Sequence, residues 1–174
     1  MIDRMMGVFK LDAKTFEDIE ADQGATGQAA VIVLVVALLG GIGAGGFNAI
    51  MGEGDTFLTA FLFTVLSTVI GWVLWSVVTY FVGTALFGGQ SSMGEMLRVI
   101  GFAYTPQLLR VIPCLGAIIG GLWTLAAGFV AVRQGLDLDN TKAFLTIVVG
   151  FIAYVALSVV LGGVTAGIGA VLGG

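Results

Sequence analysis

Residues 95–133 read EMLRVIGFAYTPQLLRVIPCLGAIIGGLWTLAAGFVAVR and hold the features on which the fold depends. The stretch is apolar enough to lie in a lipid bilayer, yet it contains Arg98, Gln107, Arg110 and the prolines Pro106 and Pro113. Charged groups at membrane depth are costly, so the few that occur there have a structural or functional role. The stretch therefore predicts membrane helices whose polar residues need a specific explanation.

The composition of the whole chain is that of a membrane protein. Of its 174 residues, 58% are hydrophobic and only 10% are charged, and the mean hydropathy is +1.08. Soluble domains carry about a quarter charged residues. Several apolar runs exceed about 18 residues, the length that indicates a transmembrane helix. We therefore predict an all-α, polytopic membrane helix bundle, with no linker long enough to divide it.

Five apolar segments predict about five transmembrane helices, over residues 28–50, 56–87, 94–112, 113–132 and 143–172. The second would be about 48 Å long, whereas the bilayer hydrocarbon is about 30 Å thick, so this helix must tilt or protrude. Pro106 should bend the third helix, because proline has no backbone N–H, and Tyr104 and Gln107 are expected to bind the carbonyls that the bend frees. Pro113 suits the first turn of the fourth helix.

Residues 1–26 form a mixed-charge segment ahead of the transmembrane domain, which we assign to residues 27–174. Apolar residues in this segment recur at spacings near three and four, which predicts one or two short amphipathic helices on the cytoplasmic membrane surface. Asp12 is expected to cap the second of these helices and Gly24 to end it. A partly ordered cytosolic tail is the alternative.

The basic residues predict the orientation of the chain, because cytoplasmic flanks of membrane helices are enriched in lysine and arginine. With five crossings, Arg110 falls on the side opposite the N-terminus. The other basic residues fall on the N-terminal side: Arg4, Lys10, Lys14, Arg98, Arg133 and Lys142. The N-terminus should therefore be cytoplasmic and the C-terminus outside. If residues 94–112 re-enter without crossing, there are four spans and both termini are cytoplasmic.

Glycines are spaced for close packing of helices. Small residues let the backbones of membrane helices approach each other. Pairs four residues apart occur in the first, fourth and fifth segments, and further glycines lie on a stripe of small and polar residues along the second. We expect these to face neighbouring helices: Gly41, Gly45, Gly71, Gly83, Gly116, Gly120, Gly163 and Gly167.

Polar and special residues in and beside the third and fourth segments form a candidate functional cluster. Glu95 and Arg98 are three residues apart, so they can form an ion pair, and Arg98 and Arg110 can each extend to one membrane surface. In one interpretation, the cluster holds the bundle together and presents a cytoplasmic face to partner proteins. In the other, its arginines contact lipid headgroups or line a path for a solute. The cluster comprises Glu95, Arg98, Tyr104, Pro106, Gln107, Arg110, Pro113, Trp123, Arg133, Gln134 and Asp137.

The sequence shows no catalytic or metal-binding set. It has no histidine, and its single cysteine cannot form an internal disulfide or a thiolate cluster. Its serines stand in no nucleophile motif, every aspartate lies in a predicted loop or tail, and no glycine loop suits phosphate. There is also no basic patch for nucleic acid. We therefore expect a protein that is not an enzyme, with no cofactor, no metal and no nucleic-acid partner.

Three stretches resemble the Ypt-interacting-protein (Yip) family of small five-span membrane proteins, in particular its compact prokaryotic members. They are KLDAKTFEDIEAD followed by GATGQAA, then FVGTALFGGQSSMGEMLRVIGFAYTPQLLRVIP, then LWTLAAGFVAVRQGLDLDNTKAF. The resemblance extends over the whole chain. The positions matched to the family's recurring residues are Phe16, Gly88, Gly89, Glu95, Arg98, Gly101, Pro106, Pro113, Trp123, Arg133, Gln134 and Lys142.

The resemblance implies five helices, a cytoplasmic N-terminus and, for a compact prokaryotic member, the plasma membrane. Eukaryotic relatives act in vesicle traffic and bind Rab-type GTPases, and they carry a longer cytosolic N-terminal region whose motif is missing here, so Rab binding is not expected. We expect a membrane scaffold, adaptor or accessory subunit that binds other integral membrane proteins or itself. Lipid or solute handling through the Arg98 and Arg110 region is the alternative.

Overall fold

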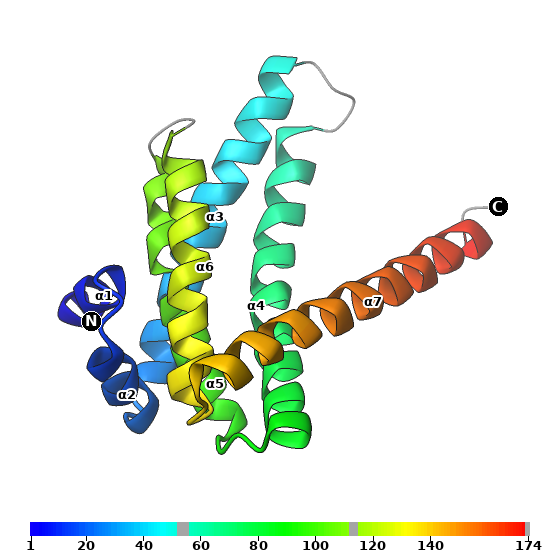
Figure 1. Ribbon diagram of the computed structural model, residues 1–174. Helices are drawn as coiled ribbons and strands as arrows, with labels where there is room; N and C mark the ends of the chain where they lie inside the picture. Colours follow the sequence, from blue (N-terminus) through cyan, green and yellow to red (C-terminus); the bar gives the residue numbers. More distant parts are fainter. Residues whose placement is uncertain (52–55, 112–114, 173–174) are drawn as a thin grey trace.

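The computed structural model describes residues 1–51, 56–111 and 115–172, with only the backbone described for Met51, Ala117 and residues 161–172. Every regular element in these ranges is a helix (Figure 1). The α-helices are α1 (Ile2–Phe9), α2 (Ala13–Ala21), α3 (Ala25–Met51), α4 (Phe57–Phe87), α5 (Met93–Ala103), α6 (Leu115–Gly135) and α7 (Asn140–Leu172), and the 3-10 helix η1 (Thr105–Val111) follows α5.

Four of the described helices are long and apolar enough to cross a membrane: Ala25–Ile50, Phe57–Phe87, Ile118–Gly135 and Asn140–Val160. Large apolar side chains on all four face outward, among them Leu34, Phe63, Leu122 and Ile152. Contiguous exposed apolar surface on this scale indicates a membrane environment. The predicted all-α membrane bundle is confirmed, and the chain is an integral membrane protein.

α3, α4, α5 with η1, and α6 run alternately up and down between two ends of the bundle (Figure 1). α3 and α4 form one antiparallel pair, and α5 with η1 runs antiparallel to α6. α7 begins where α6 ends, packs on α4 and α6, and then leans away from the bundle. We call the end at which α4 meets α5 and α6 meets α7 the polar end, and α2 lies against α5 and α6 close to it.

The third predicted span is divided into two shorter helices. α5 ends at Ala103 and η1 begins at Thr105, next to Pro106, so the expected bend is present. Neither piece alone is long enough to cross. Together they measure about 30 Å, at about 1.5 Å per α-helical and about 2.0 Å per 3-10 residue, which is close to the length of about 32 Å expected for the 21 residues of α6.

The expected role of Tyr104 and Gln107 at this bend is wrong. Among the described residues, the Thr105 hydroxyl binds a freed carbonyl, donating to the Phe102 oxygen at 2.6 Å, and neither the Tyr104 nor the Gln107 side chain makes such a bond. Threonine in a helix commonly returns its hydroxyl to a carbonyl three or four residues earlier, and this local bond forms more readily than one from a longer side chain.

α4 has the length that the sequence predicts. Its 31 residues extend about 46 Å at about 1.5 Å per residue, so it exceeds the bilayer hydrocarbon. The Thr56 hydroxyl caps its start by accepting a hydrogen bond from the Thr59 backbone N–H at 3.3 Å. The helix ends at Gly88, whose φ of 71° lies in the left-handed region that glycine adopts without strain.

The two N-terminal helices share the hydrophobic core of the bundle. Val8, Phe16 and Ile19 are fully buried in one cluster with side chains of α3, α5 and α6. Burying one large apolar side chain stabilises a fold by about 1.5–3 kcal/mol. The residues that they join include Ala29, Val33, Met96, Val99, Phe102, Ala127, Ala131 and Leu136.

The ends of α2 differ in detail from the prediction. Asp12 is the N-cap residue, but its carboxylate accepts from the Thr15 hydroxyl at 2.7 Å and makes no cap bond to the backbone. The helix stops at Ala21, before the predicted end at Gly24. Asp22 ends it because its Oδ1 accepts from the Gly24 backbone N–H at 2.8 Å, which turns the chain toward α3.

Candidate functional site

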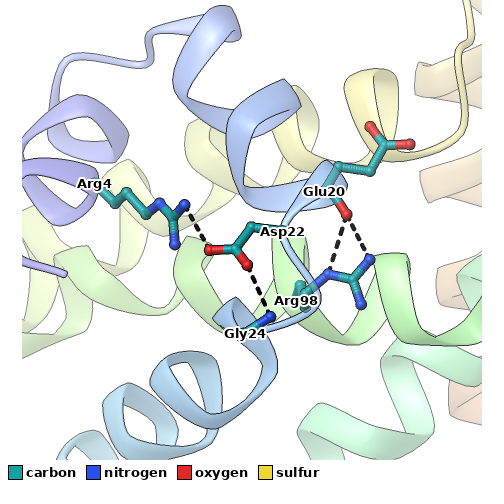
Figure 2. A network of polar contacts seen from close by, with 5 residues as sticks. All are labelled: Arg4, Glu20, Asp22, Gly24 and Arg98. Atoms are coloured by element: carbon teal, nitrogen blue, oxygen red, sulfur yellow. Dashed lines mark hydrogen bonds and ion pairs between the residues drawn. The ribbon is translucent and has the colours of Figure 1, made fainter.

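A set of polar contacts joins the two N-terminal helices to the bundle. We call α1 and α2 together the N-terminal cap. Arg98 of α5 is only 6% exposed, and both its Nε and Nη2 donate to the backbone oxygen of Glu20, the former at 3.1 Å (Figure 2). This carbonyl belongs to the last turn of α2, where helical carbonyls lack partners and a cation is favourable. Arg98 therefore completes the C-terminus of α2.

A second contact joins α1 to the turn after α2. Arg4 Nη2 lies 2.8 Å from Asp22 Oδ2, and the other oxygen of the same carboxylate accepts from Gly24 (Figure 2). The bonds from Arg4 and Gly24 hold the pKa of Asp22 below its usual range. Because this pair is solvent-exposed, it contributes little energy and mainly orients α1.

The last turn of α6 supplies a third contact. Gln134 Nε2 donates to Glu17 Oε1 of α2 at 2.7 Å. Arg133 Nε holds the Gln134 amide oxygen at 2.8 Å, and Arg133 Nη1 donates to Asn140 Oδ1 at 3.1 Å. Arg133 and Gln134 thus act as one unit that links the cap to the start of α7.

Trp123 makes the fourth contact, from the middle of α6. Its indole Nε1 donates to the Phe9 backbone oxygen at 2.8 Å, at the C-terminus of α1. The sequence singled out Trp123 but gave no partner for it, because the two residues are 114 positions apart and neither carries a local signal.

The expected ion pair between Glu95 and Arg98 is wrong. Glu95 Oε2 accepts from the Ser92 backbone N–H at 2.6 Å, while the Ser92 hydroxyl accepts from the Glu95 backbone N–H at 3.3 Å. This reciprocal capping box satisfies two unpaired N–H groups at the start of α5. The signal was present in the sequence as Ser92 followed three residues later by glutamate. Arg98 is directed instead to the end of α2.

Several carboxylates lie near the contact between Arg98 and the Glu20 main-chain oxygen, which we call the anchor. The Glu20 side chain is half-buried and points away from Arg98, which binds only its main-chain oxygen (Figure 2). Burial, followed by repulsion from Asp137 and Glu95, raises the pKa of Glu20 to about 7. Asp137 sits in the α6–α7 turn with a φ of 52°, a conformation that aspartate tolerates better than most residues.

We expect docking of the cap to weaken as the pH rises from 5 to 8. A carboxyl whose pKa is raised on docking, here from 4.5 to about 7, stabilises the docked state fully below pH 4.5 and loses that contribution as the pH passes 7. Amide hydrogen exchange in α2, corrected for the intrinsic pH dependence, measures this change. Glu20→Gln should remove most of the dependence, since the Arg98 bond uses the main chain. Tighter docking at pH 8 than at pH 5 would contradict the assignment.

The remaining residues of the predicted cluster lie away from this anchor. Arg110 is exposed in η1, with its guanidinium near Gly40 of α3. Tyr104 and Gln107 line a cavity inside the bundle. The Pro106 carbonyl lies against Gly120 of α6. Pro113 lies outside the described residues. The structure therefore brings together the residues at the polar end and separates them from Arg110.

Four of the eight glycines singled out from the sequence stand at close helix contacts. An added Cβ would lie 2.8 Å from a Phe61 carbon at Gly41, 2.6 Å from a Phe57 carbon at Gly45 and 2.7 Å from the Pro106 oxygen at Gly120. Gly83 packs against Leu136, Gly71 faces the Tyr154 hydroxyl with more room, and Gly116 is buried. Gly163 and Gly167 belong to α7, but their surroundings lie outside the described residues.

Within the described part of the chain, no group of three or more His, Cys, Asp or Glu side chains could hold a metal ion. Of the carboxylates near Glu20, Glu95 accepts from the Ser91 hydroxyl and the Ser92 backbone N–H, and Glu17 accepts from the Gln134 amide. What this arrangement does physically is fix the two helices of the N-terminal cap onto the side of a membrane bundle, from near its polar end to the middle of α6.

Comparison with known proteins agrees with the all-helical membrane architecture. No curated protein and no solved structure matches the chain at a significant level. The Yip1 domain, in contrast, matches residues 6–172, a range that starts inside α1 and includes the anchor and every long helix. A bundle of apolar helices with this match over nearly its whole length belongs to the Yip family of membrane proteins.

Proposed function

We propose that this Yip-family protein is a non-enzymatic scaffold, adaptor or accessory subunit that assembles with other integral membrane proteins or with itself. The observation that carries the proposal is how little of α4 and α7 the chain covers. In their most apolar windows, only 6% of α4 and 17% of α7 are buried. These helices offer long lateral faces to lipid or to partner helices, while the polar anchor is satisfied within the protein.

The same proposal includes an orientation and a location. Arg4, Arg98 and Arg133 take part in contacts near the polar end, whereas Arg110 belongs to η1 at the other end of the composite span. The positive-inside rule then favours a cytoplasmic polar end with the N-terminal cap, and a C-terminus outside. We place the protein in a prokaryotic plasma membrane, with the cap as its cytoplasmic face.

Photo-cross-linking in native membranes tests the scaffold role. A photoreactive amino acid at Leu66 of α4 or Val159 of α7, both strongly exposed, is expected to capture the same partner protein or a second copy of the chain. The same probe at Val99, which is fully buried, should capture neither and serves as the matched control. A stable monomer that yields no adduct from any exposed position would count heavily against the proposal.

Lipid or solute handling is the second candidate. Its original basis, a shared role of Arg98 and Arg110, gains no support, because Arg98 is engaged with Glu20 and Arg110 lies elsewhere. The observation that favours lipid handling is the cavity between the helices. If the arginines nonetheless serve transport, replacing both with glutamine will abolish lipid or solute movement in liposomes. The scaffold proposal predicts no such movement in the parent protein.

A further inference from the structure

A cavity of about 280 Å³ lies where α7 departs from the bundle. Its walls come from α4, α5, η1, α6 and α7. Aromatic and aliphatic side chains form most of the lining, including Trp75, Phe129 and Ile147. If a methylene group occupies about 30 Å³, as a water molecule does, this volume would hold roughly nine methylene groups.

The cavity opens sideways toward the bilayer. Leu125 of α6 and Phe151 of α7 belong to its lining, and both are also among the strongly exposed apolar residues of the transmembrane helices. Whatever enters between them must therefore come from the hydrocarbon region.

Three polar side chains give the cavity a chemical preference. Tyr104, Gln107 and Tyr154 contribute to its lining. Within the described residues, their side chains make no hydrogen bond to the protein, whereas the Thr124 hydroxyl is bound to the Gly120 oxygen. Unpaired polar groups are costly in hydrocarbon, so an occupant that brings hydrogen-bond acceptors fits better than a pure alkane. A fatty acyl ester has both the apolar chain and the acceptor oxygens.

We propose that this cavity binds one acyl chain of a membrane glycerophospholipid, with the ester oxygens held by Tyr104, Gln107 or Tyr154. The site does not depend on the scaffold role and requires only that the chain lies in a bilayer. Gly128 provides the opening on α6: an added Cβ there meets no atom within 4 Å, so the space in front of this residue belongs to the cavity.

The experiment uses the full chain in phosphatidylcholine vesicles that contain a small fraction of phosphatidylcholine with a diazirine on one acyl chain. After illumination, adducts are mapped by mass spectrometry. Adducts are expected on Trp75, Tyr104 and Phe129, which are not among the strongly exposed residues, as well as on outward residues such as Phe63. The adduct mass distinguishes an intact phospholipid from a free fatty acid released by hydrolysis.

Gly128→Leu should fill the cavity and reduce its labelling severalfold without changing the labelling of Phe63. Gly121→Leu is the matched control, since Gly121 lies on the same helix, has the same free space for a Cβ and does not line the cavity. Absence of adducts inside the cavity of the parent protein overturns the proposal without any variant. So does labelling that survives Gly128→Leu at the parental level, while adducts of fatty-acid mass alone would replace the phospholipid by a free acid.

Discussion

Replacing Arg98 with glutamine is expected to increase the opened population of the N-terminal cap about 100-fold. Arg98 is 6% exposed, and its guanidinium makes two charged hydrogen bonds to the Glu20 oxygen at the end of α2. Hydrogen bonds to charged groups contribute about 1.5–3 kcal/mol each, so a loss of about 3 kcal/mol is a conservative expectation. A change of about 1.4 kcal/mol is a factor of ten in an equilibrium.

Hydrogen exchange in α2 measures this opening directly. The amides of Ala13–Ala21 should exchange about 100-fold faster in the variant, in line with the opened population, while α3 keeps its protection. Arg110→Gln is the matched control, because it removes the same charge from an exposed position at the other end of the composite span. If both variants leave exchange in α2 unchanged, Arg98 does not hold the cap.

A leucine at Gly45 is expected to separate α3 from α4, the most extensive helix pair among the described residues. Its Cβ would lie 2.6 Å from the Phe57 ring and 2.8 Å from the Phe57 backbone oxygen, and a backbone oxygen cannot move without its helix. Overpacking costs about 1–3 kcal/mol, occasionally more. For a chain of this size, a loss of about 3 kcal/mol corresponds to a fall in the melting temperature of roughly 6–12 °C.

Gly43→Leu makes this test specific. Gly43 lies two residues away on α3, and an added Cβ there meets no atom within 4 Å. Both substitutions add the same apolar side chain to the same membrane helix, so they differ only in what that side chain meets. Thermal unfolding in one detergent should show a lower midpoint for Gly45→Leu alone. Equal midpoints would mean that the close α3–α4 contact does not support the fold.

The positions of the membrane helices could be predicted from the sequence because hydrophobic length is a local property. α3, α4 and α7 fall close to the segments predicted at 28–50, 56–87 and 143–172. The third segment was harder, since Pro106 and the Thr105 hydroxyl divide it into a short α-helix and a 3-10 helix. Hydropathy is averaged over such a break. It therefore identifies one long apolar segment but does not show that the segment consists of two helices.

The polar site was only half predictable, for a physical reason. Charge inside an apolar stretch identifies Arg98 as important, but it does not reveal a main-chain acceptor 78 positions away. The spacing of three residues predicted that Arg98 pairs with Glu95. The Glu95 carboxylate instead binds an unpaired N–H group at the start of α5. Main-chain partners carry no sequence signal, so the contacts of Arg98 with Glu20 and of Trp123 with Phe9 emerge only from the fold.

We infer that the polar residues at the polar end hold the N-terminal cap on a membrane bundle. Cross-linking in native membranes tests it most directly. In the native chain, Gln134 Nε2 lies 2.7 Å from Glu17 Oε1. When both residues are replaced by cysteine in a Cys114→Ser background, a short bis-maleimide should join the two cysteines rapidly. Cysteines at Glu17 and Arg110 should not react with each other under the same conditions. Equal cross-linking of both pairs, or none at Glu17 and Gln134, would contradict a docked cap.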